Sequence, residues 1–453
     1  MKKRNLVFAV LVAVALLLGA CAPAATPPPA ETVVKPLGPV TLDFTGWTYD
    51  LEKVGQNLAK YEEWIAIEDP PIEVKVEMTD AGFGEFDTHV TTRYAAGASF
   101  DVLYSSDHWL SKWAEAGWVV PLEDYYPEVR DYIPDIASYS VEAMTYKGKL
   151  YGLPYYTDVM YFMYNTKMLE DAGIASPPTT WDEVTEQAVI LKEKGITSDP
   201  VMLGLKATSW FEEAFYSLVY SEGGSFFDEN LEPVFETSSG PVYDMIEWVA
   251  AAINDYGIMP HKVLDMTAVD VQQAFKEGDT CFVIVPGYMI REFNTPGISK
   301  VAGQAAISMM PGSTHETDGY TRMYLMGSGA VKDEAKKLAA WRLIEFMGGK
   351  TTVEGVTAYH IAKRWAVENG LGFSILSLWE EPAVDKAFSA MADPTVMKAQ
   401  KQLARSKEGM AAPWFAEWIS FVRTEVQKAV LRQEPTSAVL ELLKGRWNEL
   451  KQE

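Results

Sequence analysis

Aromatic and polar side chains stand directly after four apolar runs of this sequence that are predicted to be strands. They are Trp47, Tyr49 and Asp50; Ser105, Asp107 and Trp109; Trp210; and Gly287 and Tyr288. Aromatic rings stack on the apolar faces of a small molecule, and carboxylates accept hydrogen bonds from its hydroxyl groups. Because open α/β sheets bind ligands at the carboxyl ends of their strands, these residues predict a preformed pocket with an aromatic floor.

Motifs for covalent chemistry are missing from the sequence. It contains no Gly-x-Ser-x-Gly, His-Glu-x-x-His or P-loop segment, and its five histidines have no metal-ligand spacing. We therefore expect no catalytic residue, no metal and no cofactor. A secreted glycoside hydrolase remains an alternative, because 63 acidic residues always allow some carboxylate pair at the required separation of about 5–9 Å.

The charge balance excludes two classes of partner. The 453 residues include 63 Asp+Glu against 39 Lys+Arg, a formal net charge of −24. Nucleic acid and anionic lipid surfaces both require clustered Lys and Arg, so neither is expected to bind the folded body. The length and the hydrophobic content of 48% predict two or three domains with large cores.

Residues 1–39 predict an export signal followed by a tether. Lys2–Arg4 are basic, and Leu6–Ala20 are apolar but shorter than the roughly 20 residues that span a membrane. The run ends in Leu18–Cys21, which resembles the lipobox of bacterial lipoproteins. We predict cleavage after residue 20 and lipidation of Cys21, with an ordinary signal peptide as the alternative. The proline-rich residues 21–39 then form a tether that cannot build a core.

The second cysteine, Cys281, lies inside the apolar run 281–285. With Cys21 lipidated, no intramolecular disulfide and no cysteine-based zinc site are expected. We interpret Cys281 as a small hydrophobic core residue.

From residue 40 onward, short apolar runs alternate with amphipathic helices, which predicts an α/β architecture. The expected strands are 40–44, 72–78, 101–104, 201–205 and 281–285. The expected helices are 51–67, 109–117, 181–194, 242–256, 269–276, 332–347 and 414–450, the last with a break at Pro435. Thr180 and Glu183 predict a capping box, and residues 223–230 predict a hairpin.

Five stretches together carry a resemblance to a known family. They are GKLYGLP at 148–154, YNTKML at 164–169 with AGI at 172–174, PPTTWDE at 177–183, FKEGDTCF at 275–282 and AAWRLIEFM at 339–347. Their order behind a lipobox resembles the extracytoplasmic solute-binding proteins of bacterial ABC importers. The similarity is to the carbohydrate-type family that includes the maltose- and glycerol-phosphate-binding proteins.

This resemblance implies a two-lobed periplasmic-binding-protein-like α/β fold whose hinge the chain crosses more than once. One lobe is expected over residues 40–152 plus 311–348, and the other over 153–310 plus 349–453. Such proteins close about the hinge on a ligand. The chain is thus expected to be a monomeric, lipid-anchored extracytoplasmic receptor that captures a sugar or oligosaccharide and delivers it to an ABC permease.

The resemblance adds further candidates for ligand contact. They are Tyr156 and Asp158 at the first hinge crossing, Tyr320 and Arg322 in a segment that the family often uses as a loop, and Trp414 near the C-terminal helices. Gly287 and Tyr288 stand where several relatives have a turn with a stacking tryptophan. For Trp109 and Trp414 the alternative is that they pack in the core. For Asp158 the alternative is a solvated position in a packed hinge.

The chemistry of these candidates bears on the ligand. A glycerophosphodiester or peptide remains an alternative ligand, and phosphate capture requires arginine, lysine or a helix N-terminus. The candidate walls offer mainly aromatic and acidic side chains, with only Arg291 and Arg322 as cations. A neutral sugar is therefore preferred.

Overall fold

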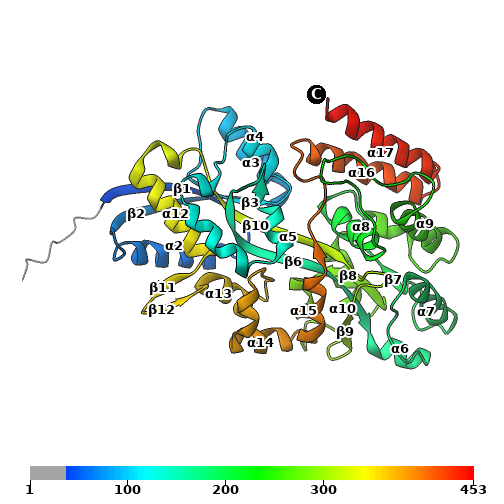
Figure 1. The fold of residues 1–453 in the computed structure, drawn as a ribbon. Coiled ribbons are helices and arrows are strands. Elements are labelled where there is room, and N and C mark those ends of the chain that lie inside the picture. The colour runs from blue at the N-terminus through cyan, green and yellow to red at the C-terminus, as the bar shows by residue number, and fades with distance from the viewer. Residues whose placement is uncertain (1–36, 453) are drawn as a thin grey trace, which may run out of the picture. The chain divides into compact units, whose positions relative to one another are not determined.

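A nine-stranded sheet runs through residues 37–452, the part of the chain that this computed structural model describes (Figure 1). Its strand order is β2-β1-β3-β10-β6-β8-β7, with β9 paired to β6 and β13 paired to β10. The strands are β1 (Leu37–Trp47), β2 (Ile72–Ala81), β3 (Val102–Ser106), β6 (Gly152–Asn165), β7 (Val201–Met202), β8 (Phe282–Pro286), β9 (Ala305–Ser308), β10 (Thr317–Met326) and β13 (Ala404–Arg405). Two small hairpins lie apart from this sheet, β4 (Thr145–Tyr146) with β5 (Lys149–Leu150) and β11 (Thr351–Val353) with β12 (Val356–Ala358).

The long strand β6 connects two groups of strands. Its residues from Gly152 to Val159 pair antiparallel with β10, which also pairs with β3. Its residues from Met160 to Asn165 pair with β8 and β9. Nearly every side chain of β6 is buried, because the strand runs through the core of both groups. The lobe boundaries at residues 152, 310 and 348 stay a prediction.

Helices cover this sheet. They are α2 (Leu51–Ile65), α3 (Phe83–Ala95), α4 (Leu110–Glu115), α5 (Ser138–Ala143), α6 (Thr166–Ala172), α7 (Trp181–Glu193), α8 (Ser209–Ser221), α9 (Pro241–Asn254), α10 (Ala268–Glu277), α11 (Ile290–Phe293), α12 (Glu334–Gly348), α13 (His360–Asn369), α14 (Pro382–Ser389), α15 (Pro394–Gln402), α16 (Phe415–Val430) and α17 (Thr436–Leu450). Helix α12 packs against β1, β6 and β10, and α8 packs against β10. None of the helices in residues 37–452 is both long enough and apolar enough to cross a bilayer.

Most of the predicted elements are found with small shifts at their ends, but the strand expected over residues 201–205 is only the two-residue strand β7. The break at Pro435 is confirmed, since α16 ends at Val430 and α17 begins at Thr436. The capping box before α7 is half correct. The Thr180 hydroxyl accepts the Glu183 backbone N–H at 3.2 Å, but the Glu183 carboxylate accepts from Thr179 instead.

Two segments differ from expectation. Residues 223–230 do not form a hairpin of strands but a loop with one isolated bridge, from Phe227 to Pro233. Residues 319–324 are not a loop but the middle of β10, because this buried segment pairs along one edge with β6 and, from Arg322 onward, along the other edge with β3. Cys281 is buried, as expected of a core residue, whereas Cys21 and the signal segment lie outside the described residues.

Candidate ligand-binding site

A cavity of about 310 Å³, which we call the aromatic cavity, lies where β1, β6 and β10 meet the first turns of α3 and α8. Its walls are Trp47, Phe83, Gly84, Tyr156, Thr208, Trp210, Glu213, Thr267, Tyr288, Tyr320 and Arg322. The residues that the sequence predicted among these are Trp47, Tyr156, Trp210, Tyr288, Tyr320 and Arg322. The structure thus brings together residues that are up to 275 positions apart, from Trp47 to Arg322.

Trp47 is the last residue of β1, and its ring stacks on two tyrosines. Its ring stacks on Tyr49 at 5.1 Å and on Tyr104 at 5.9 Å between centroids. The chain then turns at Asp50, whose φ of 44° lies in the left-handed region and whose carboxylate caps α2. The Asn369 amide donates to the Tyr49 hydroxyl and to the Asp50 carboxylate, at 3.3 and 3.0 Å. Tyr49 and Asp50 therefore lie beside the aromatic cavity rather than in its wall.

Three tyrosines form one side of the aromatic cavity. The hydroxyl groups of Tyr156 on β6 and Tyr320 on β10 form a hydrogen bond, with 2.6 Å between their oxygens. Tyr288 meets the Tyr156 ring edge-on, with 6.2 Å between centroids. Burial raises the pKa of all three phenols, so they stay neutral and can donate hydrogen bonds at any physiological pH.

Arg322 is held in place by two carboxylates and two rings. Its Nη1 lies 2.9 Å from Asp107 Oδ1, and its Nη2 lies 3.4 Å from Glu213 Oε1. Its guanidinium also lies over the rings of Tyr320 and Phe83, at 4.6 and 5.0 Å. Asp107 follows β3 and Glu213 stands on α8, so Arg322 joins two separate segments of the chain.

Glu213 carries the one carboxylate oxygen of the aromatic cavity that the described residues leave without a partner. The side chain is 3% exposed, and its Oε2 has no hydrogen-bond partner among them. Burial raises the pKa of this carboxyl, against the opposing charges of Lys407 and Arg322. A buried acceptor without a donor is costly. Oε2 is therefore a candidate to accept a hydrogen bond from a donor group of a ligand.

Asp158 and Gly287 are not wall residues of the aromatic cavity, but they position Tyr288, which is. The Asp158 carboxylate accepts the backbone N–H groups of Tyr288 at 2.8 Å and of Val159 at 2.9 Å. A side chain at position 287 would collide with the Asp158 carboxylate and the Tyr161 ring. Burial raises the pKa of Asp158 to about 6.

The remaining predicted residues lie outside the walls. Ser105 is fully buried, and Trp109 stacks on Phe86 at 5.4 Å within the core. Trp414 directly precedes α16, and its ring lies edge-on to that of Trp447, with 5.6 Å between centroids. A role for these three residues at a ligand stays a prediction.

Glu213 and Phe83 are wall residues that the sequence did not single out. Glu213 follows the predicted Trp210 by three positions, so both lie on one face of α8. That spacing is a signal that could have identified Glu213. Phe83 begins α3, a helix with no counterpart among the predicted elements.

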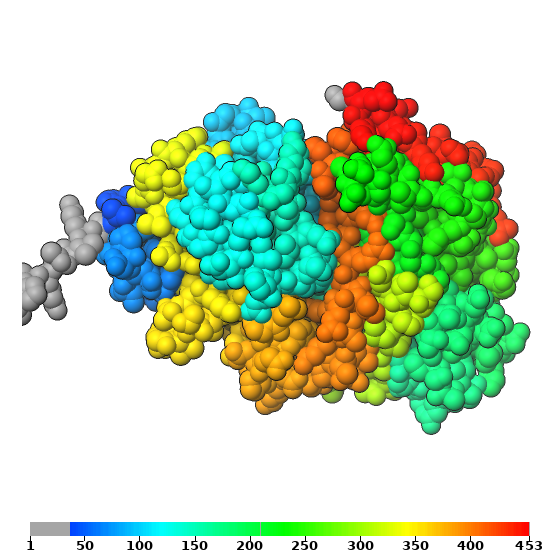
Figure 2. Space-filling model, viewed as in Figure 1, coloured from blue at the N-terminus to red at the C-terminus, as the bar shows by residue number. Residues whose placement is uncertain are grey.

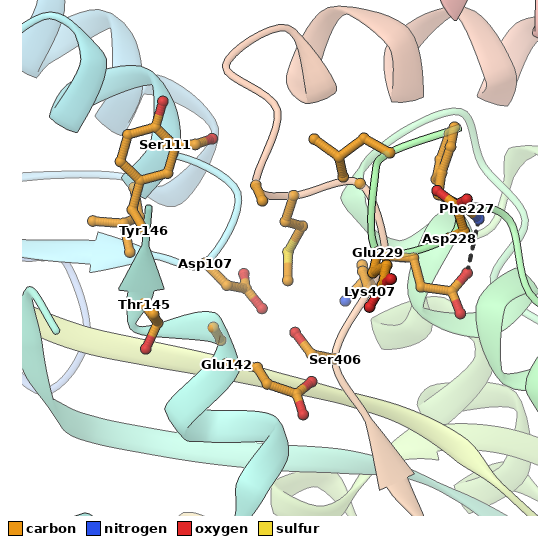
Figure 3. A pocket seen from close by; sticks show the side chains of 17 residues that line it. Asp107, Ser111, Glu142, Thr145, Tyr146, Phe227, Asp228, Glu229, Ser406 and Lys407 are labelled. Carbon is orange, nitrogen blue, oxygen red and sulfur yellow. Dashed lines mark hydrogen bonds between the residues drawn. The ribbon is translucent and has the colours of Figure 1, made fainter. Parts of the chain in front are cut away.

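A second cavity of about 280 Å³, the acidic cavity, lies on the other side of Asp107 (Figure 3). Its charged wall residues are Asp107, Glu142, Asp228, Glu229, Lys407 and Glu408. In Figure 3, Asp107, Glu142 and Ser406 surround its centre. Within residues 37–452, no group of three or more His, Cys, Asp or Glu side chains is arranged to hold a metal ion.

Buried ion pairs separate the two cavities. His108 reaches Asp107 Oδ1 at 3.0 Å with Nδ1 and Glu212 Oε1 at 3.4 Å with Nε2. Lys407 Nζ lies 2.7 Å from Asp318 Oδ2, and both side chains are fully buried. Although burial acts to raise the pKa of Asp107, the charges of His108 and Arg322 hold it well below its usual value. Asp107 is therefore an anion that keeps Arg322 fixed.

Comparison with known proteins gives a family and a fold. The model of a family described as bacterial extracellular solute-binding protein matches residues 68–353. A maltotriose-binding protein of Pyrococcus abyssi is 28% identical over 182 residues, which cover 40% of this chain and 36% of that protein. A mannitol-binding protein of Pseudomonas aeruginosa is 25% identical over 270 residues, covering 56% and 58% respectively. The matches thus span less than two thirds of these relatives.

Solved structures match over nearly their whole length. A maltose-bound T. maritima protein has a TM-score of 0.73 at 18% identity, covering 90% of this chain and 99% of its own. An Agrobacterium radiobacter ABC transporter solute-binding protein in complex with ribitol has a TM-score of 0.72 at 16% identity, covering 92% and 100%. These likenesses confirm the predicted two-lobed α/β fold.

Proposed function

Because the chain belongs to the bacterial extracellular solute-binding protein family, we propose that it is an extracytoplasmic receptor for a small sugar or polyol. The ligand binds in the aromatic cavity without covalent change and passes to the membrane subunits of an ABC importer. The observation that carries this proposal is the buried Glu213 Oε2, an acceptor to which no described residue donates, on a wall residue of a cavity lined by aromatic rings.

Sugars and polyols fit the chemistry of these walls. Their C–H faces pack on rings such as Trp47 and Trp210, and their hydroxyl groups donate to Glu213. The tyrosine hydroxyls supply donors and acceptors around them. A maltotriose-binding and a mannitol-binding protein among the relatives support the same ligand class.

The size of the aromatic cavity favours a short ligand. Its volume of about 310 Å³ lies at the lower end of the range of small-molecule sites, roughly 300–1,000 Å³. A monosaccharide, a disaccharide or an alditol therefore suits it better than a long oligosaccharide.

A phosphate ester is disfavoured because the candidate arginines are already engaged. Arg322 is paired with Asp107 and Glu213, and Arg291 Nη1 donates to the Glu368 carbonyl at 2.6 Å. The remaining polar wall residues carry no positive charge. These contacts support a neutral ligand.

Capture works by a shift between open and closed forms. On one side, the walls of the aromatic cavity come from β1 and α3, and on the other side they come from α8 and Tyr288. Strands β6 and β10 connect the group of strands that contains β1 with the group that contains β8. A ligand that contacts both sides binds the closed form more tightly and so populates it. The closed form is the one that the permease recognises.

The setting of this receptor follows from the N-terminal segment. We propose that Cys21 is acylated, that the residues from 21 to 36 form a tether, and that the protein acts as a monomer. Residues 37–39, which the sequence predicted to be part of the tether, instead begin strand β1. The negative charge of the body repels anionic lipid, so the acyl chains alone hold it at the membrane. The two lobes correspond to residues 40–152 plus 311–348 and residues 153–310 plus 349–453.

A thermal-shift screen against monosaccharides, disaccharides and alditols tests this function. A ligand that binds only the native protein at 100 times its dissociation constant stabilises it by about 2.7 kcal/mol. We expect at least one such compound to raise the melting temperature and to be recovered unchanged. A screen without a shift, or turnover of the compound, would contradict the proposal.

A further inference from the structure

A third cavity, of about 420 Å³, shares no wall residue with the aromatic or the acidic cavity. We call it the lysine cavity. It lies between residues 136–139, residues 373–380 and helix α15 with the short segment that follows it. Backbone pairing fixes these walls, since the Ala137 N–H donates to the Ser374 carbonyl at 2.9 Å and Ile136 bridges to Ile375. In Figure 2 the orange surface that includes α15 lies between the cyan and green surfaces.

Lys401 is a buried cation in the wall of the lysine cavity. Its side chain donates to the Phe373 carbonyl at 2.9 Å, the single hydrogen bond that the described residues give this ammonium. An ammonium group has three N–H donors, so two remain available. Burial lowers the pKa of Lys401 to about 8, against the attraction of Asp158. A charge with so few protein partners is costly in this position.

Two further polar groups surround the same space. The Ser374 hydroxyl is buried, with 3% of the residue exposed, and has no hydrogen-bond partner among the described residues. Lys398 brings a second ammonium, which lies 5.3 Å over the Trp379 ring. The wall carboxylate, Glu380, is exposed to solvent. Positive charge and an unpaired hydroxyl therefore dominate the polar part of this cavity.

The other walls are apolar. Phe373 and Trp379 flank Lys401, with their ring centroids 4.8 and 5.6 Å from its Nζ. Ile136 and Leu376 extend this surface. A ligand that uses the whole cavity needs an anionic end for Lys401 and an apolar body for the rings.

We propose that the lysine cavity is a second binding site, for a small carboxylate with an apolar body. The carboxylate accepts hydrogen bonds from Lys401 Nζ and the Ser374 hydroxyl, and the body packs between Phe373 and Trp379. Hydrogen bonds from an ammonium to a carboxylate are about twice as strong as neutral ones, which makes the charge the main determinant. This site is independent of the sugar in the aromatic cavity.

Isothermal titration of the full chain with benzoate tests this site, with benzyl alcohol as the neutral probe of similar shape. Benzoate is expected to bind and benzyl alcohol is not. Lys401→Met should weaken benzoate binding by about tenfold or more, and Ser374→Ala by a few-fold. Lys386→Met, an exposed lysine on α14, serves as the matched control and should leave it unchanged.

Several outcomes would overturn the proposal. They are no heat of binding with millimolar benzoate, equal binding of benzyl alcohol, or equal binding of inorganic sulfate. Unchanged affinity in a folded Lys401→Met protein would do the same. Should Lys401→Met fail to fold, Ser374→Ala decides, because loss of a hydroxyl leaves the walls intact, and unchanged affinity there would reject the site.

Discussion

The aromatic and the acidic cavity have nearly the same volume, about 310 and 280 Å³, and border the same buried ion pairs, yet their walls differ. The aromatic cavity combines six large rings with one carboxylate oxygen that has no hydrogen-bond partner within residues 37–452. In the acidic cavity, Asp228 accepts the backbone N–H groups of Asn230 and Glu232, both at 2.9 Å. Glu408 accepts from the Phe227 N–H and pairs with Arg405. These two carboxylates thus serve the local fold.

This difference teaches that neither volume nor the number of acidic residues identifies a ligand site in this molecule. The acidic cavity has more carboxylates, but the chain itself satisfies Asp228 and Glu408. Glu213 is satisfied only in part, and a ligand hydroxyl would complete it. The predictions below test this contrast, beginning with the largest expected effect.

Removing Arg322 should damage both cavities at once. Arg322→Met leaves Asp107 and Glu213 buried without their common cation, which should lower the free energy of unfolding by about 3–5 kcal/mol. Urea denaturation measures this loss. Arg130→Met, which breaks an exposed ion pair with Glu123, is the control and should change stability by less than about 1 kcal/mol. Equal losses in both variants would show that the buried pairs do not organise the cavities.

Replacing the unpaired carboxylate separates the two cavities. Glu213→Gln removes a charged acceptor from the aromatic cavity and should weaken sugar binding by about tenfold to 100-fold. Glu142→Gln makes the same change in the acidic cavity and should leave affinity unchanged. Isothermal titration with the best compound from the screen measures both. A larger loss in Glu142→Gln would assign the ligand to the acidic cavity.

The aromatic wall should contribute less than the carboxylate. Trp210→Ala removes a stacking surface, so we expect a loss of affinity of about threefold to tenfold in the same titration. Trp210→Phe keeps a ring and should lose less. If both variants bind as tightly as the original protein, Trp210 does not face the ligand.

The smallest expected effect is on the pH dependence. Burial raises the pKa of Glu213, so protonation begins at higher pH than for an exposed glutamate. Since the ionised carboxylate is the stronger acceptor for a ligand hydroxyl, affinity should fall as the pH is lowered from neutral into the acid range. The Glu213→Gln protein has no such titration and should show a flatter profile, even though Asp158, with a pKa of about 6, titrates nearby. Parallel profiles would exclude Glu213 as the acceptor.

The rule that ligands bind at strand ends predicted part of the site from sequence. It identified Trp47 at the end of β1, Trp210 in the first turn of α8 and Tyr288 after β8, because these positions depend on local patterns. The same rule cannot tell a cavity from a core. Ser105 lies inside β3 and is paired with Met323 of β10, whereas Trp109 follows β3 but packs on Phe86 of α3 in the core.

Contacts between distant segments could not be predicted from a single sequence. Arg322 and Asp107 pair across 215 positions, and the missing partner of Glu213 Oε2 is visible only once α8 and β10 are packed together. Likewise, the family resemblance suggested a loop at residues 319–324, whereas pairing with β3 and β6 makes it a strand. The fold class was predictable because it depends on the order of helices and strands along the chain. The polar partners of Arg322 and Glu213 were not, because they depend on how distant segments pack.

A crystal structure of the protein with the most stabilising sugar or polyol from the screen tests the central claim most directly. We predict that the ligand lies in the aromatic cavity, with a face packed on Trp47 or Trp210 and a hydroxyl within hydrogen-bond distance of Glu213 Oε2. A ligand found in the acidic cavity, or one that leaves Oε2 without a partner, would contradict this account.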